Sequence, residues 1–452
     1  MQSSILELSK RLRAREISPV ELTKDCLARI EQLNPILNAF ITVTADAALA
    51  QAHQAEVEIQ RGDWRGPLHG IPLAVKDLID TAGVLTTVAS AHFKDRIPSQ
   101  DAEVVRRLKE SGAVLLGKQN LHEFAYGGSS VVSYFGPVRN PWDTARIAGG
   151  SSGGSAASVA AGLGYAAIGT DTAGSVREPA AFCGIVGLKP TYARVSAQGV
   201  IPLSVSLDHL GPIVRTVADA AILLNAIADP SVGSIPDYAS GIEKDPRAFR
   251  VGIPRKFFYD ELDPEIAAAT DQALSIIKAL TAEMREVAVV VDTDRTLQMV
   301  EAYRFHAEFA GRNPELYFPE TLRRIRTGEN FTDADANAAR NKLALARNEV
   351  ANVFKDVDVL VTPTVSIPPP VLAELLDQPD LLRPTELVML RNTRPFNTWG
   401  IPAISLPCGF TAAGLPIGLQ ICAAPWQEAT VLQLAHAYEQ ATEWHKRSPN
   451  LQ

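Results

Sequence analysis

Glycine is concentrated in one short segment of this chain. Ten of its 30 glycines lie within residues 149–187, where only three residues are charged. The ten are Gly149, Gly150, Gly153, Gly154, Gly162, Gly164, Gly169, Gly174, Gly184 and Gly187, and the three are Asp171, Arg177 and Glu178. Glycine allows tight turns and a close approach of the backbone to a ligand. This segment is therefore the expected functional site.

The remaining composition excludes several classes of protein. Lys and Arg number 43 against 51 Asp and Glu, so the net charge of −8 argues against a nucleic-acid partner, which favours a basic surface. Hydrophobic residues make up 46% and charged residues 21%, which excludes a disordered chain. The 452 residues allow up to three domains by length alone and are ample for a large core.

The cysteines and the apolar stretches carry no sign of a metal site or a membrane span. Cys26, Cys183, Cys408 and Cys422 form no C-x-x-C pair, so we expect buried reduced thiols and neither a disulfide framework nor a metal. Residues 1–16 are charged and amphipathic, unlike a signal peptide. The longest apolar stretch, residues 156–169, is too short to cross a bilayer. We expect a cytoplasmic protein that needs no cofactor.

Strand-like and helix-like segments alternate along the chain, which predicts an α/β fold. Ser18 and Pro19 are typical of a helix start, and residues 3–60 are expected to be helical. The expected strands cover residues 71–75, 113–116, 357–361 and 403–406, the last two ending before a proline. Further helices are expected at 102–111, 121–126, 155–163, 217–228, 264–282, through most of 295–356, and at 427–440.

Two common motifs overlap the glycine-rich segment, and neither fits its context. Residues 149–153 match the G-x-S-x-G nucleophile elbow, but that motif follows a strand, and residues 139–146 are polar and turn-like. Residues 162–167 match the dinucleotide pattern G-x-G-x-x-A. That fold needs a strand before the motif and an acid about 20 residues later, where Phe182 stands instead.

A third interpretation is acyl transfer. An oxyanion hole needs consecutive backbone N–H groups facing a small cavity, and Thr172, Ala173, Gly174 and Ser175 can supply them. Ser175 would carry the nucleophilic hydroxyl, which needs a base in hydrogen-bond reach. Lys76, at the end of an apolar strand, is the candidate, because burial favours the neutral form of a lysine. Taken singly, each of these residues also fits an ordinary tight turn or surface position.

At this point the sequence resembles the amidase signature family of serine hydrolases. Gly-Gly-Ser-Ser-Gly-Gly-Ser occupies residues 149–155, followed by Asp-Thr-Ala-Gly-Ser at 171–175 and Arg-Glu-Pro-Ala at 177–180. The strand with its lysine matches at residues 70–77. Further blocks that look like the family lie at 117–125, 140–142, 187–191 and 400–409. The resemblance spans nearly the whole chain.

The resemblance implies a Ser–cisSer–Lys triad. Ser175 matches the nucleophile, Ser151 the bridging serine with a cis peptide bond before it, and Lys76 the base. It implies a mixed, twisted sheet covered on both faces by helices. Residues 1–452 would form one amidase domain. Its parts would be an N-terminal helical region (1–60), a signature core (66–215) and a variable region that shapes the substrate pocket (about 295–400).

Two departures from the family pattern bear on activity. Ala173 stands where the family has glycine, so the oxyanion hole is expected to be slightly narrower and still active. In the family's tRNA-dependent amidotransferases, an aspartate for glutamine recognition lies about ten residues before the last Asn-x-x-Gly, and an ungapped alignment puts Leu390 there. This weakens the amidotransferase interpretation without removing it.

The leading hypothesis is therefore a stand-alone amidase that cleaves a small-molecule carboxamide, carbamate or anilide. The alternatives are the glutaminase subunit of a tRNA-dependent amidotransferase, with a partner subunit, and a catalytically dead scaffold. A homodimer is kept open. Gly127, Gly128 and Ser129 are expected near the substrate. Seven aromatic residues would either line the pocket or, as we favour, belong to the core: Trp142, Tyr303, Phe305, Tyr317, Phe318, Phe396 and Trp399.

Overall fold

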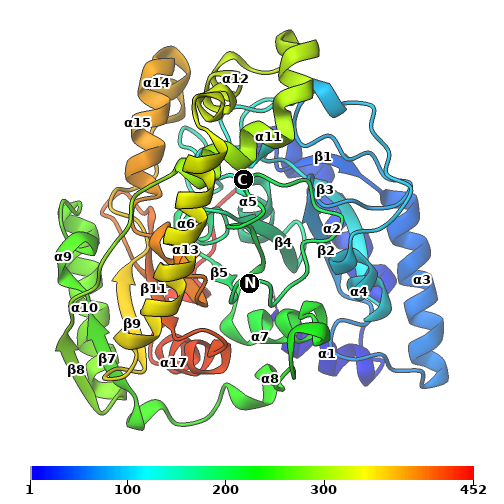
Figure 1. The fold of residues 1–452 in the computed structure, drawn as a ribbon. Coiled ribbons are helices and arrows are strands. Elements are labelled where there is room, and N and C mark those ends of the chain that lie inside the picture. The colour runs from blue at the N-terminus through cyan, green and yellow to red at the C-terminus, as the bar shows by residue number, and fades with distance from the viewer. Residues whose placement is uncertain (1–2, 452) are drawn as a thin grey trace.

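A computed structural model describes residues 3–451, and one 11-stranded sheet runs through them (Figure 1). The strand order is β1-β3-β2-β4-β6-β5-β10-β11-β9-β7-β8. The strands are β1 (Phe40–Val43), β2 (Pro72–Lys76), β3 (Val114–Gln119), β4 (Ala166–Asp171), β5 (Val186–Lys189), β6 (His209–Val214), β7 (Arg250–Ile253), β8 (Glu283–Glu286), β9 (Val359–Pro363), β10 (Ala403–Phe410) and β11 (Pro416–Ala423). The sheet is mixed, because β2 pairs in parallel with β3 and β4 whereas β4 and β6 are antiparallel.

Helices surround the sheet, as predicted, with α3 and α4 beside the β1–β3 end and α9 and α10 beside β7 and β8 (Figure 1). In the N-terminal half they are α1 (Ile5–Arg13), α2 (Pro19–Leu37), α3 (Ala45–Arg61), α4 (Glu103–Glu110), α5 (Gly153–Ala160), α6 (Arg177–Cys183), α7 (Val217–Ile227) and α8 (Tyr238–Gly241). The rest are α9 (Arg255–Phe258), α10 (Pro264–Leu280), α11 (Thr296–Arg312), α12 (Pro319–Arg326), α13 (Asp333–Val353), α14 (Leu372–Asp377), α15 (Pro379–Met389), α16 (Pro395–Thr398) and α17 (Glu428–Gln440).

The alternation of side chains along β2 decides where Lys76 points. Leu73 and Val75 belong to one hydrophobic cluster, with residues of α4 and α7. Ala74 belongs to another, with residues of α2 and α5. Because side chains on a strand alternate between the two faces, Lys76 lies on the same face as Ala74. The strand therefore directs its terminal lysine toward α5 and the glycine-rich loop before it.

Several predicted elements differ in the structure. Residues 40–43, expected to be helical, form strand β1, which pairs with β3. The helix expected at 121–126 is only a 3₁₀ turn, Glu123–Ala125. Strands β9 and β10 do not end before a proline, because they include Pro363 and Pro407. The register of β10 against β11 shifts just after Pro407, so an irregularity of the ladder accommodates a residue that lacks an N–H.

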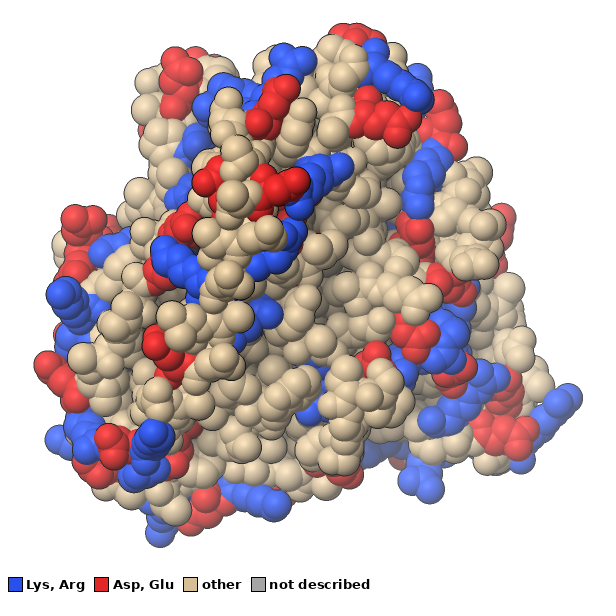
Figure 2. Space-filling view, viewed as in Figure 1, with Lys and Arg blue, Asp and Glu red and all other residues tan. Residues whose placement is uncertain are grey.

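Three further expectations concern the chain as a whole. All four cysteines are buried and unpaired, as predicted. Among the described residues, no helix combines the length and the hydropathy that a membrane span requires. Charged side chains of both signs are dispersed over α13 and around the edge of the face in Figure 2, and no basic stripe crosses it. The single-domain organisation stays a prediction.

Candidate active site

Lys76 is fully buried, and two hydroxyl groups hold its amine. Its Nζ donates to Ser151 Oγ at 2.7 Å and to Thr170 Oγ1 at 2.8 Å. Thr170 reaches it because β2 and β4 run parallel, so that their carboxyl ends lie side by side. Burial lowers the pKa of Lys76 to about 7, against the opposing effects of the Asp208 and Asp171 carboxylates. A substantial fraction of this lysine is therefore neutral near neutral pH.

Ser151 follows a cis peptide bond, Gly150–Ser151, which confirms the prediction. Its carbonyl oxygen accepts from the His122 N–H at 3.1 Å and from Ser130 Oγ at 3.3 Å. The Gly150 N–H donates to Glu178 Oε2 at 2.8 Å, and Glu178 comes three residues after Ser175. One buried hydrogen bond thus ties the loop of the bridging serine to the helix that begins just after the predicted nucleophile.

Three of the four N–H groups predicted to form an oxyanion hole are free of hydrogen bonds within the described residues. The N–H groups of Thr172, Ala173 and Ser175 have no hydrogen-bond partner within residues 3–451. Gly174 is the exception, because its N–H donates to Asp171 Oδ1 at 2.8 Å. The prediction for Gly174 is therefore wrong in this structure. Its backbone has φ of 139°, and the turn it makes is what directs its N–H to the aspartate.

A fully buried ion pair fixes this turn. Arg177 Nε and Nη2 donate to the two oxygens of Asp171, each at 2.9 Å. The remaining Arg177 N–H groups donate to the Thr393 carbonyl, the Gln420 amide oxygen and the Asn397 amide oxygen. The Arg177 charge is the largest of the effects that lower the pKa of Asp171, and they outweigh its burial. Sequence reasoning missed this role, although these are two of the three charges in the glycine-rich segment.

The Ser175 side chain has no hydrogen-bond partner among the described residues. Ser175 is 5% exposed, and its hydroxyl makes no hydrogen bond within the described part of the chain. The structure therefore joins Lys76 to Ser151 and leaves the Ser151–Ser175 link unmade. Catalytic hydrogen bonds are often long before substrate binds and tighten in the complex.

A cavity of about 210 Å³ adjoins residues 172–175, which we call the oxyanion loop after their predicted role. Ala173 lines this cavity, and we call it the Ala173 cavity. Its lining includes Ala173, Arg295, Gln298, Arg383, Leu390 and Arg394. Gly127, Gly128 and Ser129, which were predicted near the substrate, are not among the residues that line this cavity, and their role stays a prediction. A Cβ on Gly128 would lie 3.0 Å from Leu390 Cδ1, and Ser129 Oγ donates to Glu386 at 2.7 Å. None of the seven candidate aromatic residues lines the Ala173 cavity.

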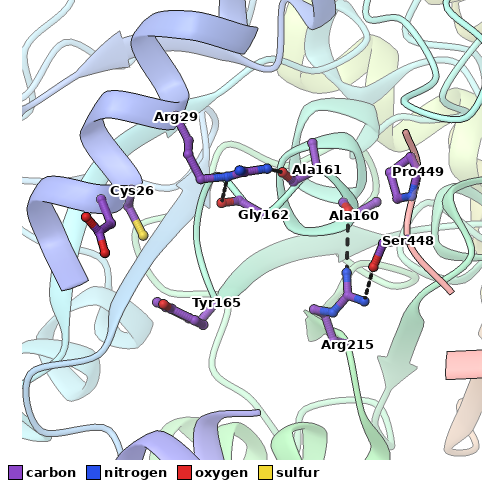
Figure 3. A pocket seen from close by; sticks show the side chains of 10 residues that line it. Cys26, Arg29, Ala160, Ala161, Gly162, Tyr165, Arg215, Ser448 and Pro449 are labelled. Carbon is purple, nitrogen blue, oxygen red and sulfur yellow. Dashed lines mark hydrogen bonds between the residues drawn. The ribbon is translucent and has the colours of Figure 1, made fainter. Parts of the chain in front are cut away.

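A second cavity, of about 310 Å³, lies at the C-terminal end of α5 (Figure 3). Arg29 donates to the carbonyls of Ala161 and Gly162, and Arg215 donates to the carbonyl of Ala160. Carbonyls at a helix C-terminus lack intrahelical partners, so these arginines satisfy the end of α5. We assign this cavity a structural role, and no predicted catalytic residue lines it.

Comparisons with known proteins show which family and fold this chain shares. The family model described as Amidase matches residues 21–432. A glutamyl-tRNA(Gln) amidotransferase subunit of Geobacter sp. (strain M21) is 41% identical over 99% of both chains. The native peptide amidase of Stenotrophomonas maltophilia superposes with a TM-score of 0.85 and 31% identity, over 99% of this chain and 98% of that one. The corresponding glutamyl-tRNA(Gln) amidotransferase subunit from Thermotoga maritima superposes with a TM-score of 0.80 and 34% identity, over 98% and 95%.

Proposed function

We propose, because this chain belongs to the amidase signature family, that it hydrolyses the C–N bond of a small-molecule amide through an acyl-enzyme on Ser175. The observation that carries the proposal is the hydrogen bond between Lys76 and Ser151, together with the lowered pKa of Lys76. The hydrogen bonds of this buried lysine go only to hydroxyl groups, and burial favours its neutral form, which is the form that can accept a proton. The open N–H groups of residues 172, 173 and 175 give a second, independent support.

The reaction follows from these positions. Neutral Lys76 accepts a proton from Ser151, which accepts one from Ser175, and Ser175 Oγ attacks the amide carbonyl carbon. The carbonyl oxygen becomes an oxyanion that the free N–H groups of the loop stabilise. The proton then passes back through Ser151 to the amide nitrogen, the C–N bond breaks, and ammonia or an amine leaves. Water attacks the ester by the same relay, which releases the acid and restores Ser175.

A second candidate is the glutaminase subunit of a tRNA-dependent amidotransferase. The sequence relatives favour it, since glutamyl-tRNA(Gln) amidotransferase subunits are about 40% identical to this chain over nearly its whole length. It uses the same serine chemistry on glutamine and requires a partner subunit. Leu390, an apolar side chain at the edge of the Ala173 cavity, is the feature that speaks for the first candidate.

One panel separates the two candidates. The purified chain is tested on aliphatic amides, aryl amides, carbamates, ureas and glutamine, with ammonia or amine release as the readout, and Ser175→Ala is the control. Turnover of a non-glutamine amide by the chain alone, lost in Ser175→Ala, is the expected result. Release of ammonia from glutamine only when a partner subunit is added would establish the second candidate. Undiminished turnover by Ser175→Ala would overturn both.

A further inference from the structure

The Ala173 cavity opens beside the proposed oxyanion hole. Ala173 belongs to its lining, and Leu390 contacts the oxyanion loop from the cavity side. A Cβ on Gly174 would lie 3.0 Å from Leu390 Cδ2, so the leucine packs against the residue before the nucleophile. A group bound in this cavity would therefore belong to the molecule whose carbonyl lies at Ser175.

The charges of the lining are predominantly positive. Arg295, Arg383, Arg391 and Arg394 line the Ala173 cavity, and among the described lining residues Asp292 is the one acid. Asp292 is paired with Lys342, whose Nζ lies 3.0 Å from it.

Two of these arginines have acidic partners that offset their charge. Arg383 lies 3.7 Å from the Glu386 carboxylate, and Arg391 lies 3.8 Å from that of Glu261. The other two arginines, Arg295 and Arg394, have no such acidic partner within the described residues.

Neither Arg394 nor Arg295 is hydrogen-bonded to a carboxylate within the described residues. Arg394 donates to the Gln298 amide oxygen and to the Asp294 backbone carbonyl, each at 2.8 Å, and both acceptors are neutral. Its Nε is buried and has no partner within residues 3–451. The guanidinium of Arg295, partly buried, makes no hydrogen bond or ion pair with the described residues. Burial and the neighbouring arginine charges lower the pKa of Arg295 to about 10 and of Arg394 to about 9.

Such a pair of guanidinium groups suits a planar anion. A guanidinium presents its N–H groups as a rigid fork that matches a carboxylate, and an unpaired buried donor is costly unless a ligand satisfies it. We propose that Arg295 and Arg394 bind a carboxylate of the substrate, so that the substrate is the monoamide of a dicarboxylic acid. This inference rests on the proposed function and names its substrate class.

The same lining argues against a free amino acid. Glutamine carries an ammonium group as well as a carboxylate, and a buried ammonium needs an anionic or carbonyl acceptor. The acidic lining residue is already paired with Lys342, and the Gln298 amide oxygen already accepts from Arg394. Leu390 offers no acceptor. The cavity thus favours a substrate with negative charge alone.

The test compares anionic amides with neutral amides of the same length. Malonamate and succinamate are paired with malonamide and succinamide, and kcat/KM is measured for each. The wild-type chain is expected to prefer the anion of its best pair by at least about 100-fold, since a site built for a polar group rejects analogues that lack it. Arg295→Gln and Arg394→Gln are expected to reduce this preference at least about tenfold, chiefly through KM. Arg394→Lys, which keeps the charge without the fork, should fall between.

A matched control and a binding measurement complete the test. Arg312→Gln removes an exposed arginine of α11 that pairs with Glu308, and it should keep the wild-type preference. Malonate and succinate are also titrated against Ser175→Ala protein by thermal shift, which requires no turnover. At least one of them should raise Tm in Ser175→Ala and not in the Ser175→Ala, Arg394→Gln double variant.

The outcomes separate this inference from the proposed function. Equal kcat/KM within each pair, with turnover abolished in Ser175→Ala, overturns the carboxylate site and leaves the amidase. No Tm shift with either dianion overturns it as well, whatever the turnover. Absence of amide turnover together with a shift that depends on Arg394 keeps the anion site and removes the amidase.

Discussion

Arg177 in the signature core and Arg394 beside the Ala173 cavity differ in how completely their guanidinium groups are hydrogen-bonded. Arg177 donates through all three of its nitrogens, and Asp171 neutralises its charge. Arg394 has two neutral acceptors, and its buried Nε has none within residues 3–451. The hydrogen bonds of the first arginine are complete, whereas the second has a buried donor that no described residue satisfies.

This difference separates the two halves of the proposed site. In the signature core, glycines and small hydroxyl side chains bring the backbone, Lys76 and Ser151 together, and the polar groups largely satisfy one another. Around residues 295–400, long charged side chains from helices and loops surround a cavity, and some of their donors are unpaired. In the proposed function the core supplies the chemistry, and in the further inference the cavity selects the molecule on which it acts.

The largest expected effect belongs to the core. Ser175→Ala and Lys76→Ala should each lower kcat by at least about 10⁴-fold on every accepted amide, because relay members act as a unit. The double variant should be about as slow as either single variant. Steady-state rates on two chemically different amides check this, with the exposed Lys278→Ala and Ser275→Ala as controls. A strictly additive double variant would contradict a shared relay.

The contrast between the arginines predicts unequal costs in stability. Arg177→Gln leaves the Asp171 carboxylate buried and unpaired, so the free energy of unfolding should fall by about 3–5 kcal/mol. Arg394→Gln breaks two bonds to neutral acceptors and should cost clearly less. Denaturant unfolding of both variants beside wild type measures the difference. An equal loss would mean that Arg394 is as structural as Arg177.

A third prediction concerns pH. Lys76 has a pKa lowered to about 7 and must be neutral to accept a proton, so activity should rise with pH through about 7. Below that value kcat/KM should fall about tenfold per pH unit. The profile from pH 5 to 9 is measured on a neutral amide, whose own charge does not change. Asp208→Asn removes a carboxylate that raises the Lys76 pKa, so it should move the midpoint to lower pH; a flat profile would exclude Lys76 as the base.

The smallest effect is expected where the two halves meet. Ala173 lies in the oxyanion loop and also lines the Ala173 cavity, and its carbonyl accepts from Thr393 Oγ1 at 2.7 Å. Ala173→Gly keeps the N–H and removes one methyl group, so kcat/KM should change by no more than about fivefold. Parallel assays of the anionic and neutral amides test this. A change beyond about 100-fold would show that the methyl group positions the loop.

The sequence was informative where local rules determine the structure. An apolar strand that ends in a lysine singled out Lys76, and the family resemblance gave Ser151 and the cis bond before it. The structure brings Lys76 and Ser151 into contact and contains the cis bond, while their catalytic roles stay a prediction. The fate of the Gly174 N–H was missed although its acceptor, Asp171, stands only three residues earlier. Aspartate side chains compete for nearby backbone N–H groups in turns. The short strand β1 was missed because its pairing with β3 involves residues far along the chain.

The Ala173 cavity was beyond sequence reasoning for a different reason. Residues 295–356 were expected to be charged and mostly helical, which they are, and such charges usually lie on solvated faces. Arg295 and Arg394 are about a hundred residues apart, and only the tertiary packing brings both to one lining. Their significance depends on which partners are absent, and a sequence pattern does not record that.

The central claim is that Ser175 is the nucleophile. A fluorophosphonate probe should label the wild-type chain at one site, and peptide mass mapping should place the adduct on Ser175. Ser175→Ala should give no adduct, and labelling of wild type should slow as the pH falls below about 7, since the same base activates the serine. An adduct on any other residue, or labelling that persists in Ser175→Ala, would contradict the account.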